Sequence, residues 1–147
     1  MSMRMIFVAA FLLASCGGST TSGPTGPTGG GPVSYDGNWS VQVQISSCYS
    51  FTNTATVIVS GGAFSGTLFT YCANAQTGAT RLSTTGCGSD ITETVSIQQG
   101  TMSGSSVVGN LFLSGGACSG GNGFSGGLSA TSGQAGSFWG TLNFTKM

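Results

Sequence analysis

The stretch Trp39-Ser40-Val41-Gln42-Val43-Gln44-Ile45 decides the fold class, because apolar and polar residues alternate along its whole length. A period of two residues is typical of a β-strand with one face buried and the other in water. The odd-numbered residues of this stretch therefore share the buried face. Between this stretch and Met147, no segment shows an apolar stripe with the 3.6-residue period of a helix. We expect an all-β domain.

Further segments have the composition of strands, and turn-forming pairs such as Gly61-Gly62 and Gly115-Gly116 separate several of them. An even number of consecutive antiparallel strands lets the last strand pair with the first, which removes both open edges of the sheet. The sequence therefore predicts a small eight-stranded antiparallel up-and-down (meander) barrel. The predicted strands cover residues 39–45, 55–60, 64–71, 78–83, 91–98, 106–114, 124–131 and 138–145.

A short pattern, Phe-x-Gly-x-Leu, recurs within these predicted strands at residues 64–68, 124–128 and 138–142. In a strand its Phe, Gly and Leu share one face, which we expect to be the barrel interior. The glycine then relieves crowding between two large side chains or lets the strand bend. Trp139 alternates with Phe138 and is predicted to face away from that interior.

The N-terminus has the pattern of an export signal. Arg4 is followed by ten apolar residues at positions 5–14, a run typical of a signal peptide and too short to span a bilayer. The sequence Leu13-Ala14-Ser15-Cys16 resembles the lipobox of bacterial lipoproteins. The resemblance implies cleavage before Cys16 and its lipidation with two or three acyl chains, palmitate among them. An ordinary signal-peptidase site beside a chance cysteine is the alternative.

Three segments follow from this organisation. Residues 1–15 form the signal peptide, and residues 16–33 contain the lipidated cysteine and a tether of Gly, Ser, Thr and Pro. Residues 34–147 form the barrel domain. In Gram-negative lipoproteins, an aspartate directly after the lipidated cysteine tends to retain the protein in the inner membrane. This chain has Gly17 at that position, so the resemblance implies a lipid-anchored protein of the outer membrane. The sequence leaves its periplasmic or cell-surface orientation open.

Four further cysteines remain in the domain, an even number that predicts two disulfides in an exported chain. With eight strands, Cys48 and Cys72 fall at one end of the barrel and Cys87 and Cys118 at the other. This placement favours the pairs Cys48–Cys72 and Cys87–Cys118. If residues 78–83 are a loop, all four lie at one end and the preference is weak. Wide spacing and the absence of histidine argue against zinc and other metal sites.

Composition excludes several classes of function. Only 4% of residues are charged and the net charge is zero, so a basic surface for nucleic acid is missing. Without histidine, the Gly-x-Ser-x-Gly match at residues 123–127 cannot belong to a Ser-His-Asp triad. Asp90 and Glu93 fall on opposite faces of one strand and are interpreted as solvated surface charges. We therefore expect no catalytic residue, no enzyme activity and no cofactor.

Gly37-Asn38-Trp39, at the start of the first predicted strand, is similar to the Gly-x-Trp motif that opens lipocalin-like barrels. This resemblance implies an up-and-down, lipocalin-like (calycin-type) barrel, often with an apolar ligand in its mouth, and a basic residue, matched by Lys146, packed over the tryptophan. The lipobox, the tether and the four cysteines together also resemble small bacterial lipoproteins that have no assigned activity.

Two functional hypotheses remain. In the first, the chain is an envelope lipoprotein whose barrel is a non-catalytic structural or interaction module, filled by its own side chains and meeting an envelope protein. In the alternative, the barrel carries a small apolar ligand, with Trp39, Trp139 and Tyr71 as candidate ligand-binding residues. The simpler interpretation of the tryptophans is packing, with Trp39 at the barrel base and Trp139 over a neighbouring strand.

Overall fold

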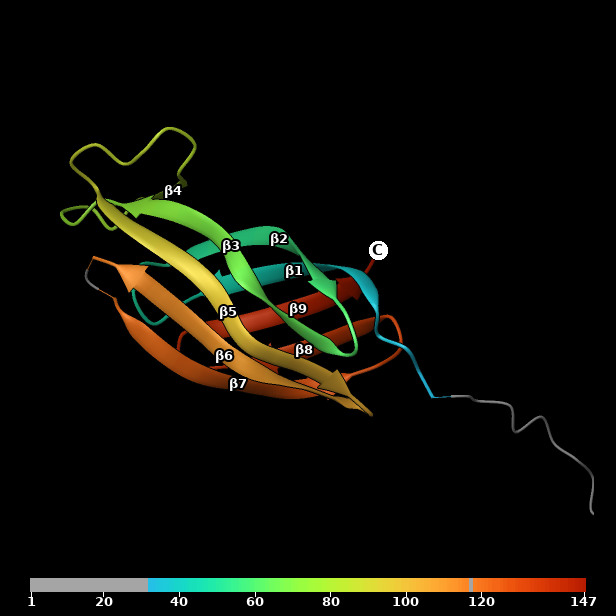
Figure 1. Cartoon of the computed structure of the whole chain (residues 1–147). Coiled ribbons are helices and arrows are strands. Elements are labelled where there is room, and N and C mark those ends of the chain that lie inside the picture. Colours follow the sequence, from blue (N-terminus) through green and yellow to red (C-terminus); the bar gives the residue numbers. More distant parts are fainter. Residues whose placement is uncertain (1–31, 117) are drawn as a thin grey trace, which may run out of the picture. The chain divides into compact units, whose positions relative to one another are not determined.

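The computed structural model describes residues 32–116 and 118–147, which form β-strands and connections with no helix among them (Figure 1). The predicted signal peptide, Cys16 and nearly all of the tether lie outside the described residues. Nine antiparallel strands follow in order: β1 (Gly37–Ile45), β2 (Phe51–Val59), β3 (Ala63–Ala73), β4 (Thr80–Leu82), β5 (Ile91–Ser103), β6 (Ser106–Gly115), β7 (Gly120–Leu128), β8 (Ser132–Gly136) and β9 (Gly140–Lys146).

The strands form one sheet that curls into a nearly closed up-and-down barrel. Their order is β2-β1-β9-β8-β7-β6-β5-β3-β4, and the predicted antiparallel pairing of the first strand with the last is confirmed. The sheet stays open between β2 and β3, which share an isolated bridge between Ser60 and Ala63. We call this open line between β2 and β3 the seam. All-β class and barrel architecture are therefore as the sequence predicted.

The structure has nine strands, not the predicted eight, although the meander without β4 still has eight. Residues 78–83 supply only the three-residue β4, which pairs with the end of β3 and lies outside the meander, because β3 pairs directly with β5. The prediction has no strand at residues 132–136, where the structure has β8, because the sequence Ser-Gly-Gln-Ala-Gly holds a single apolar residue, Ala135. One strand too many and one too few leave an even number in the meander, so β1 and β9 still run antiparallel.

Side chains from all around the barrel fill its interior. The rings of Phe64, Phe124 and Phe144, from β3, β7 and β9, pack together with centroids 5.8 to 6.5 Å apart. Burying each such ring contributes about 1.5–3 kcal/mol. Trp39, Val41, Val43, Val95, Val107, Leu111, Leu113 and Leu142 are fully buried around them.

The recurring Phe-x-Gly-x-Leu pattern behaves as predicted in β7, where Phe124 and Leu128 are both buried. In the last copy the prediction is wrong, because β9 begins at Gly140 and the two residues before it belong to a turn. A Cβ atom on Gly140 would lie 1.8 Å from the carbonyl oxygen of Gln44, so only glycine permits this approach of β9 to β1. As a result Phe138 is exposed and Trp139 packs against the core.

The two ends of the barrel differ. At one end, which we call the strap end, residues 34–36 cross the β2–β3 and β5–β6 turns. The Tyr35 hydroxyl donates to the Gly104 carbonyl, and Asp36 accepts from the Gly62 amide at 3.3 Å. At the other end, the loop end, the β1–β2, β3–β5, β6–β7 and β8–β9 connections meet. Figure 1 shows the N-terminal residues of the domain, in blue, leaving from the strap end.

Candidate functional site

All four domain cysteines lie at the loop end and form two disulfides, as the sequence predicted. The predicted pairing is wrong: Cys48 is bonded to Cys118 and Cys72 to Cys87, with Cα–Cα distances of 6.3 and 5.3 Å. The error follows from the strand count, because β4 adds no strand to the meander and therefore does not send the later cysteines to the other end. Cys48–Cys118 joins the β1–β2 connection to the β6–β7 connection, across the mouth of the barrel.

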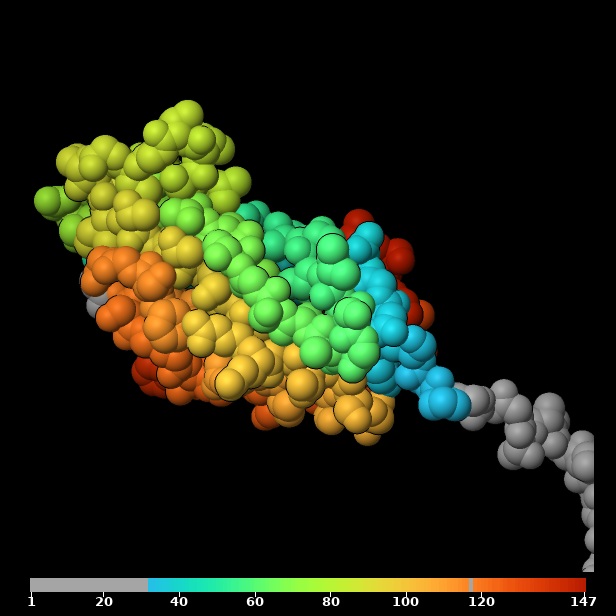
Figure 2. Space-filling view, viewed as in Figure 1, coloured from blue at the N-terminus to red at the C-terminus, as the bar shows by residue number. Residues whose placement is uncertain are grey.

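The β3–β5 connection is held by the Cys72–Cys87 disulfide and by a small polar cluster. Arg81 and Asp90 form an ion pair at 3.4 Å, and the Asn74 amide donates to Asp90 at 3.0 Å. The interpretation of Asp90 as a surface charge therefore holds only in part, since it is half-buried and paired. Figure 2 shows this connection, in yellow-green, as a lobe that stands out from the loop end.

The prediction that Glu93 is a solvated surface charge is wrong. Its side chain is 0% exposed, the one charged residue fully buried among the described residues. Glu93 lies on β5 in the same alternating row as Val95 and Ile97, which are also buried. The alternation of residues 91–97 therefore places Glu93 on the buried face of the strand, together with Val95 and Ile97. One carboxylate oxygen, Oε1, accepts a hydrogen bond from the backbone amide of Cys118 at 3.2 Å.

Three buried polar atoms at the loop end have no hydrogen-bond partner among the described residues. They are the Tyr71 hydroxyl, Glu93 Oε2 and Trp139 Nε1. Tyr71 and Glu93 are directly opposite each other on β3 and β5 and both face the interior. Burial raises the pKa of Tyr71 to about 12, and the negative charges of Glu93 and Tyr49 add to the rise. Such unpartnered buried groups are rare in folded proteins, and each calls for an explanation.

The predicted ligand-binding residues are divided between the two ends. Tyr71 and Trp139 come together at the loop end, whereas Trp39 lies near the strap end. The Trp39 ring is fully buried, its indole donates to the Tyr35 carbonyl at 2.7 Å, and Lys146 Nζ lies 6.0 Å from its ring centroid. This is the basic residue over the tryptophan that the lipocalin-like resemblance implied. Packing and this hydrogen bond account for the position of Trp39, whereas Tyr71 and Trp139 each keep a buried polar atom without a partner among the described residues.

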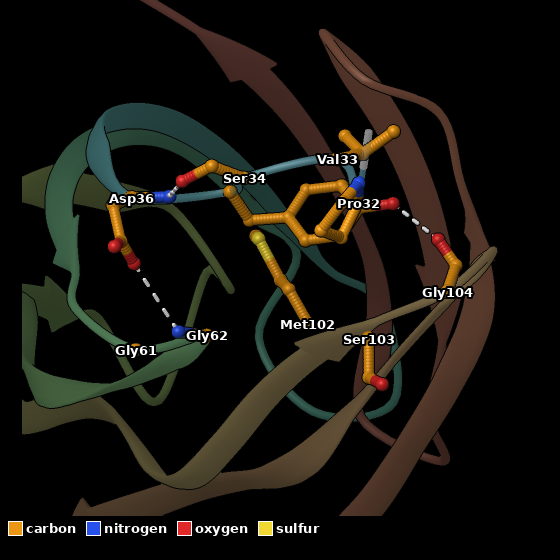
Figure 3. A pocket seen from close by; sticks show the side chains of 10 residues that line it. Pro32, Val33, Ser34, Asp36, Gly61, Gly62, Met102, Ser103 and Gly104 are labelled. Carbon is orange, nitrogen blue, oxygen red and sulfur yellow. Dashed lines mark hydrogen bonds between the residues drawn. The ribbon is translucent and has the colours of Figure 1, made fainter. Parts of the chain in front are cut away.

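A cavity of about 430 Å³ lies at the strap end, between residues 32–36 and the turns at Gly61–Gly62 and Ser103–Gly104. Figure 3 shows the Met102 side chain pointing toward the strap in this cavity. Residues 32–36 and the two turns form its walls, so the cavity lies outside the interior in which the aromatic rings pack. It offers one carboxylate, Asp36, which already accepts the hydrogen bond from Gly62.

The described residues also limit the chemistry. No three of their His, Cys, Asp and Glu side chains gather where they could hold a metal ion. Ser125, the serine of the Gly-x-Ser-x-Gly match, lies within strand β7, whereas a nucleophile elbow places it in a strand-to-helix turn. In residues 32–116 and 118–147 there is no apolar helix of membrane-spanning length.

Comparison with known proteins adds no relative to this description. No protein-family model matches the chain, and neither a curated protein nor a solved structure matches it significantly.

Proposed function

We propose that the chain is a lipid-anchored lipoprotein of the bacterial outer membrane, and that its barrel is a non-catalytic interaction module. One observation carries the proposal: the polypeptide enters the barrel at the strap end, and the disulfide-linked connections lie at the opposite end. An anchor at Cys16 reaches the barrel through the strap end, so it leaves the loop end free for a partner in the envelope.

The exposed groups of the loop end support this role. Phe138 is 66% exposed beside Trp139, and Leu82 on β4 is exposed as well. Aromatic side chains are enriched where proteins bind each other. The Cys72–Cys87 disulfide holds the connection that carries Leu82, and the Phe138 amide donates to the Asn122 side chain at 3.0 Å. Both residues are therefore held in place, which lowers the entropy lost on binding. With so few charges on the chain, recognition depends on shape and apolar contact.

The packed interior favours the module over the alternative of a carrier for a small apolar ligand. A carrier needs open volume along the barrel axis. In this barrel, Phe64, Phe124 and Phe144 meet across the interior, and neighbouring interior positions are fully buried.

The anchoring part of the proposal is tested by metabolic labelling with an alkynyl fatty acid in a Gram-negative host. Wild type is expected to incorporate the label and to fractionate with the outer membrane. Cys16→Ser is expected to lose the label. Label retained in Cys16→Ser would refute lipidation at this cysteine.

The interaction part is tested with a photo-crosslinking amino acid placed at Phe138 in the anchored protein. Ile58, a 71% exposed apolar residue on β2 near the strap end, is the matched control position. A discrete adduct in intact cells is expected from position 138 and not from position 58. Equal adducts from both positions, or none from position 138, would contradict a loop-end interaction.

A further inference from the structure

Glu93 has no charge partner in the described chain. The two described cations are Arg81, which pairs with Asp90, and Lys146, which donates to the Ser34 carbonyl at the strap end. The hydrogen bond from the Cys118 amide satisfies one carboxylate oxygen and leaves Oε2 without a donor. An uncompensated buried carboxylate is strongly unfavourable. Its position therefore calls for a cation from outside the described chain.

The groups around Oε2 define what that cation must offer. Tyr71, directly across the sheet from Glu93, has a free hydroxyl, and cross-strand neighbours of this kind have Cβ atoms about 4.5–5.5 Å apart. The Phe51 ring stacks on Tyr71 with centroids 4.5 Å apart and planes at 9°. The surroundings are thus one carboxylate oxygen, one hydroxyl and aromatic faces.

This combination suits an organic ammonium ion better than a metal ion. Metal ions of the alkali and alkaline-earth groups take about six or more oxygen ligands, and the site offers far fewer. An ammonium group donates hydrogen bonds to a carboxylate and a hydroxyl and is attracted by aromatic faces. We infer that the Glu93–Tyr71 pair at the loop end binds a small primary ammonium compound.

The seam supplies the entrance. Phe51, Asn53 and Ala55 point to the interior from β2 but are only half-buried, whereas interior residues farther along β2 are fully buried. Where the seam reaches the loop end, Thr80 on β4 donates to the Ser50 carbonyl at 2.8 Å. Tyr71 itself pairs with Leu82 of β4, so at this end the open line runs between β2 and β4, and the half-buried Phe51 ring lies beside it against Tyr71. The inferred path to Tyr71 and Glu93 runs past this ring.

The test uses the full chain in detergent, labelled with ¹⁵N, and methylammonium chloride as the probe. The chain has only two tryptophans, so its spectrum contains two indole N–H signals. Trp139, whose buried indole N–H at the loop end has no partner among the described residues, is the reporter, and Trp39, whose indole is hydrogen-bonded to the Tyr35 carbonyl near the strap end, is the internal control. We expect a saturable shift of the Trp139 signal, with Trp39 unchanged. Potassium chloride at matched ionic strength and methanol, an uncharged analogue, are expected to leave Trp139 in place.

Glu93→Gln keeps the shape of the side chain and removes its charge. It is expected to weaken methylammonium binding about tenfold or more, as the loss of a charge-assisted hydrogen bond does. Asp36→Asn, a carboxylate change at the strap end, is the matched control and is expected to bind as wild type. If Glu93→Gln fails to fold, Tyr71→Phe replaces it, with a severalfold loss expected. Unchanged binding in the variant tested, an equal shift with potassium, or no saturable shift of Trp139 overturns the inference.

Discussion

Removing the Cys48–Cys118 disulfide is expected to destabilise the barrel more than removing Cys72–Cys87. The first closes a chain segment with a sequence separation of 70 residues and the second one of 15 residues. Loop-closure entropy in the unfolded chain then gives about 4.4 kcal/mol for the first disulfide and about 3 kcal/mol for the second. The difference of about 1.4 kcal/mol corresponds to roughly tenfold in the unfolding equilibrium.

The structure adds a local reason in the same direction. Cys118 donates its backbone amide to Glu93, so freeing the β6–β7 connection also removes the hydrogen bond that the structure gives this buried carboxylate. Cys72–Cys87, by contrast, closes a connection that its own ion pair and β4 also hold. The entropic difference between the two disulfides is therefore a lower bound.

The assay is urea unfolding of the Cys48→Ala/Cys118→Ala and Cys72→Ala/Cys87→Ala variants beside wild type, followed by tryptophan fluorescence. Trp39 and Trp139 lie at opposite ends of the barrel, so both ends are monitored. Peptide mapping of the wild type without reduction checks the pairing directly. Equal losses in the two variants, or a larger loss in the Cys72/Cys87 variant, would refute the reasoning.

Three further predictions concern the close packing at Gly140 and the buried polar groups of Glu93 and Tyr71. Gly140→Ala should lose about 1–3 kcal/mol of unfolding free energy by overpacking against Gln44, while Gly136→Ala, where a Cβ meets open space, should unfold near the wild-type urea midpoint. Glu93→Met, measured in amine-free buffer, should gain about 1–3 kcal/mol by removing a buried unpaired carboxylate, and a loss of stability would contradict this. The pKa of Tyr71 is raised from 10.0 to about 12, so the folded chain holds this proton more tightly than the unfolded chain. Stability should therefore be full below pH 10 and fall toward pH 12, and Tyr71→Phe should flatten that fall in urea midpoints measured across the range.

The fold was largely predictable because burial imposes a strict alternation on strands such as β1. β8 was not, since glycine and polar residues occupy almost all of it and pairing with β7 and β9 determines its conformation. The direction of the Trp139 side chain was not predictable either, because it depends on where β9 begins. That point is set by the close approach of Gly140 to Gln44, a tertiary contact that local sequence does not reveal.

Of the residues that the sequence suggests for ligand binding, Tyr71 and Trp139 lie at the loop end, and each has a buried polar atom without a partner among the described residues. Glu93 was missed although its row of residues on β5 alternates correctly, because a lone carboxylate is usually found in water. The disulfide pairing depended on the number of strands in the meander, so a local error about residues 78–83 became a wrong assignment across the whole barrel end.

The placement of the strap has a mechanical consequence. The described chain begins at the strap end, and the strands run between the two ends, so a pull applied between residues 34–36 and the loop end acts along the strands. Hydrogen bonds in an antiparallel ladder lie perpendicular to the strands. Such a pull shears many of them together instead of opening them one at a time. β1, the first strand to take the load, is hydrogen-bonded on both sides, to β2 and to β9. The barrel is thus built to resist tension along its axis.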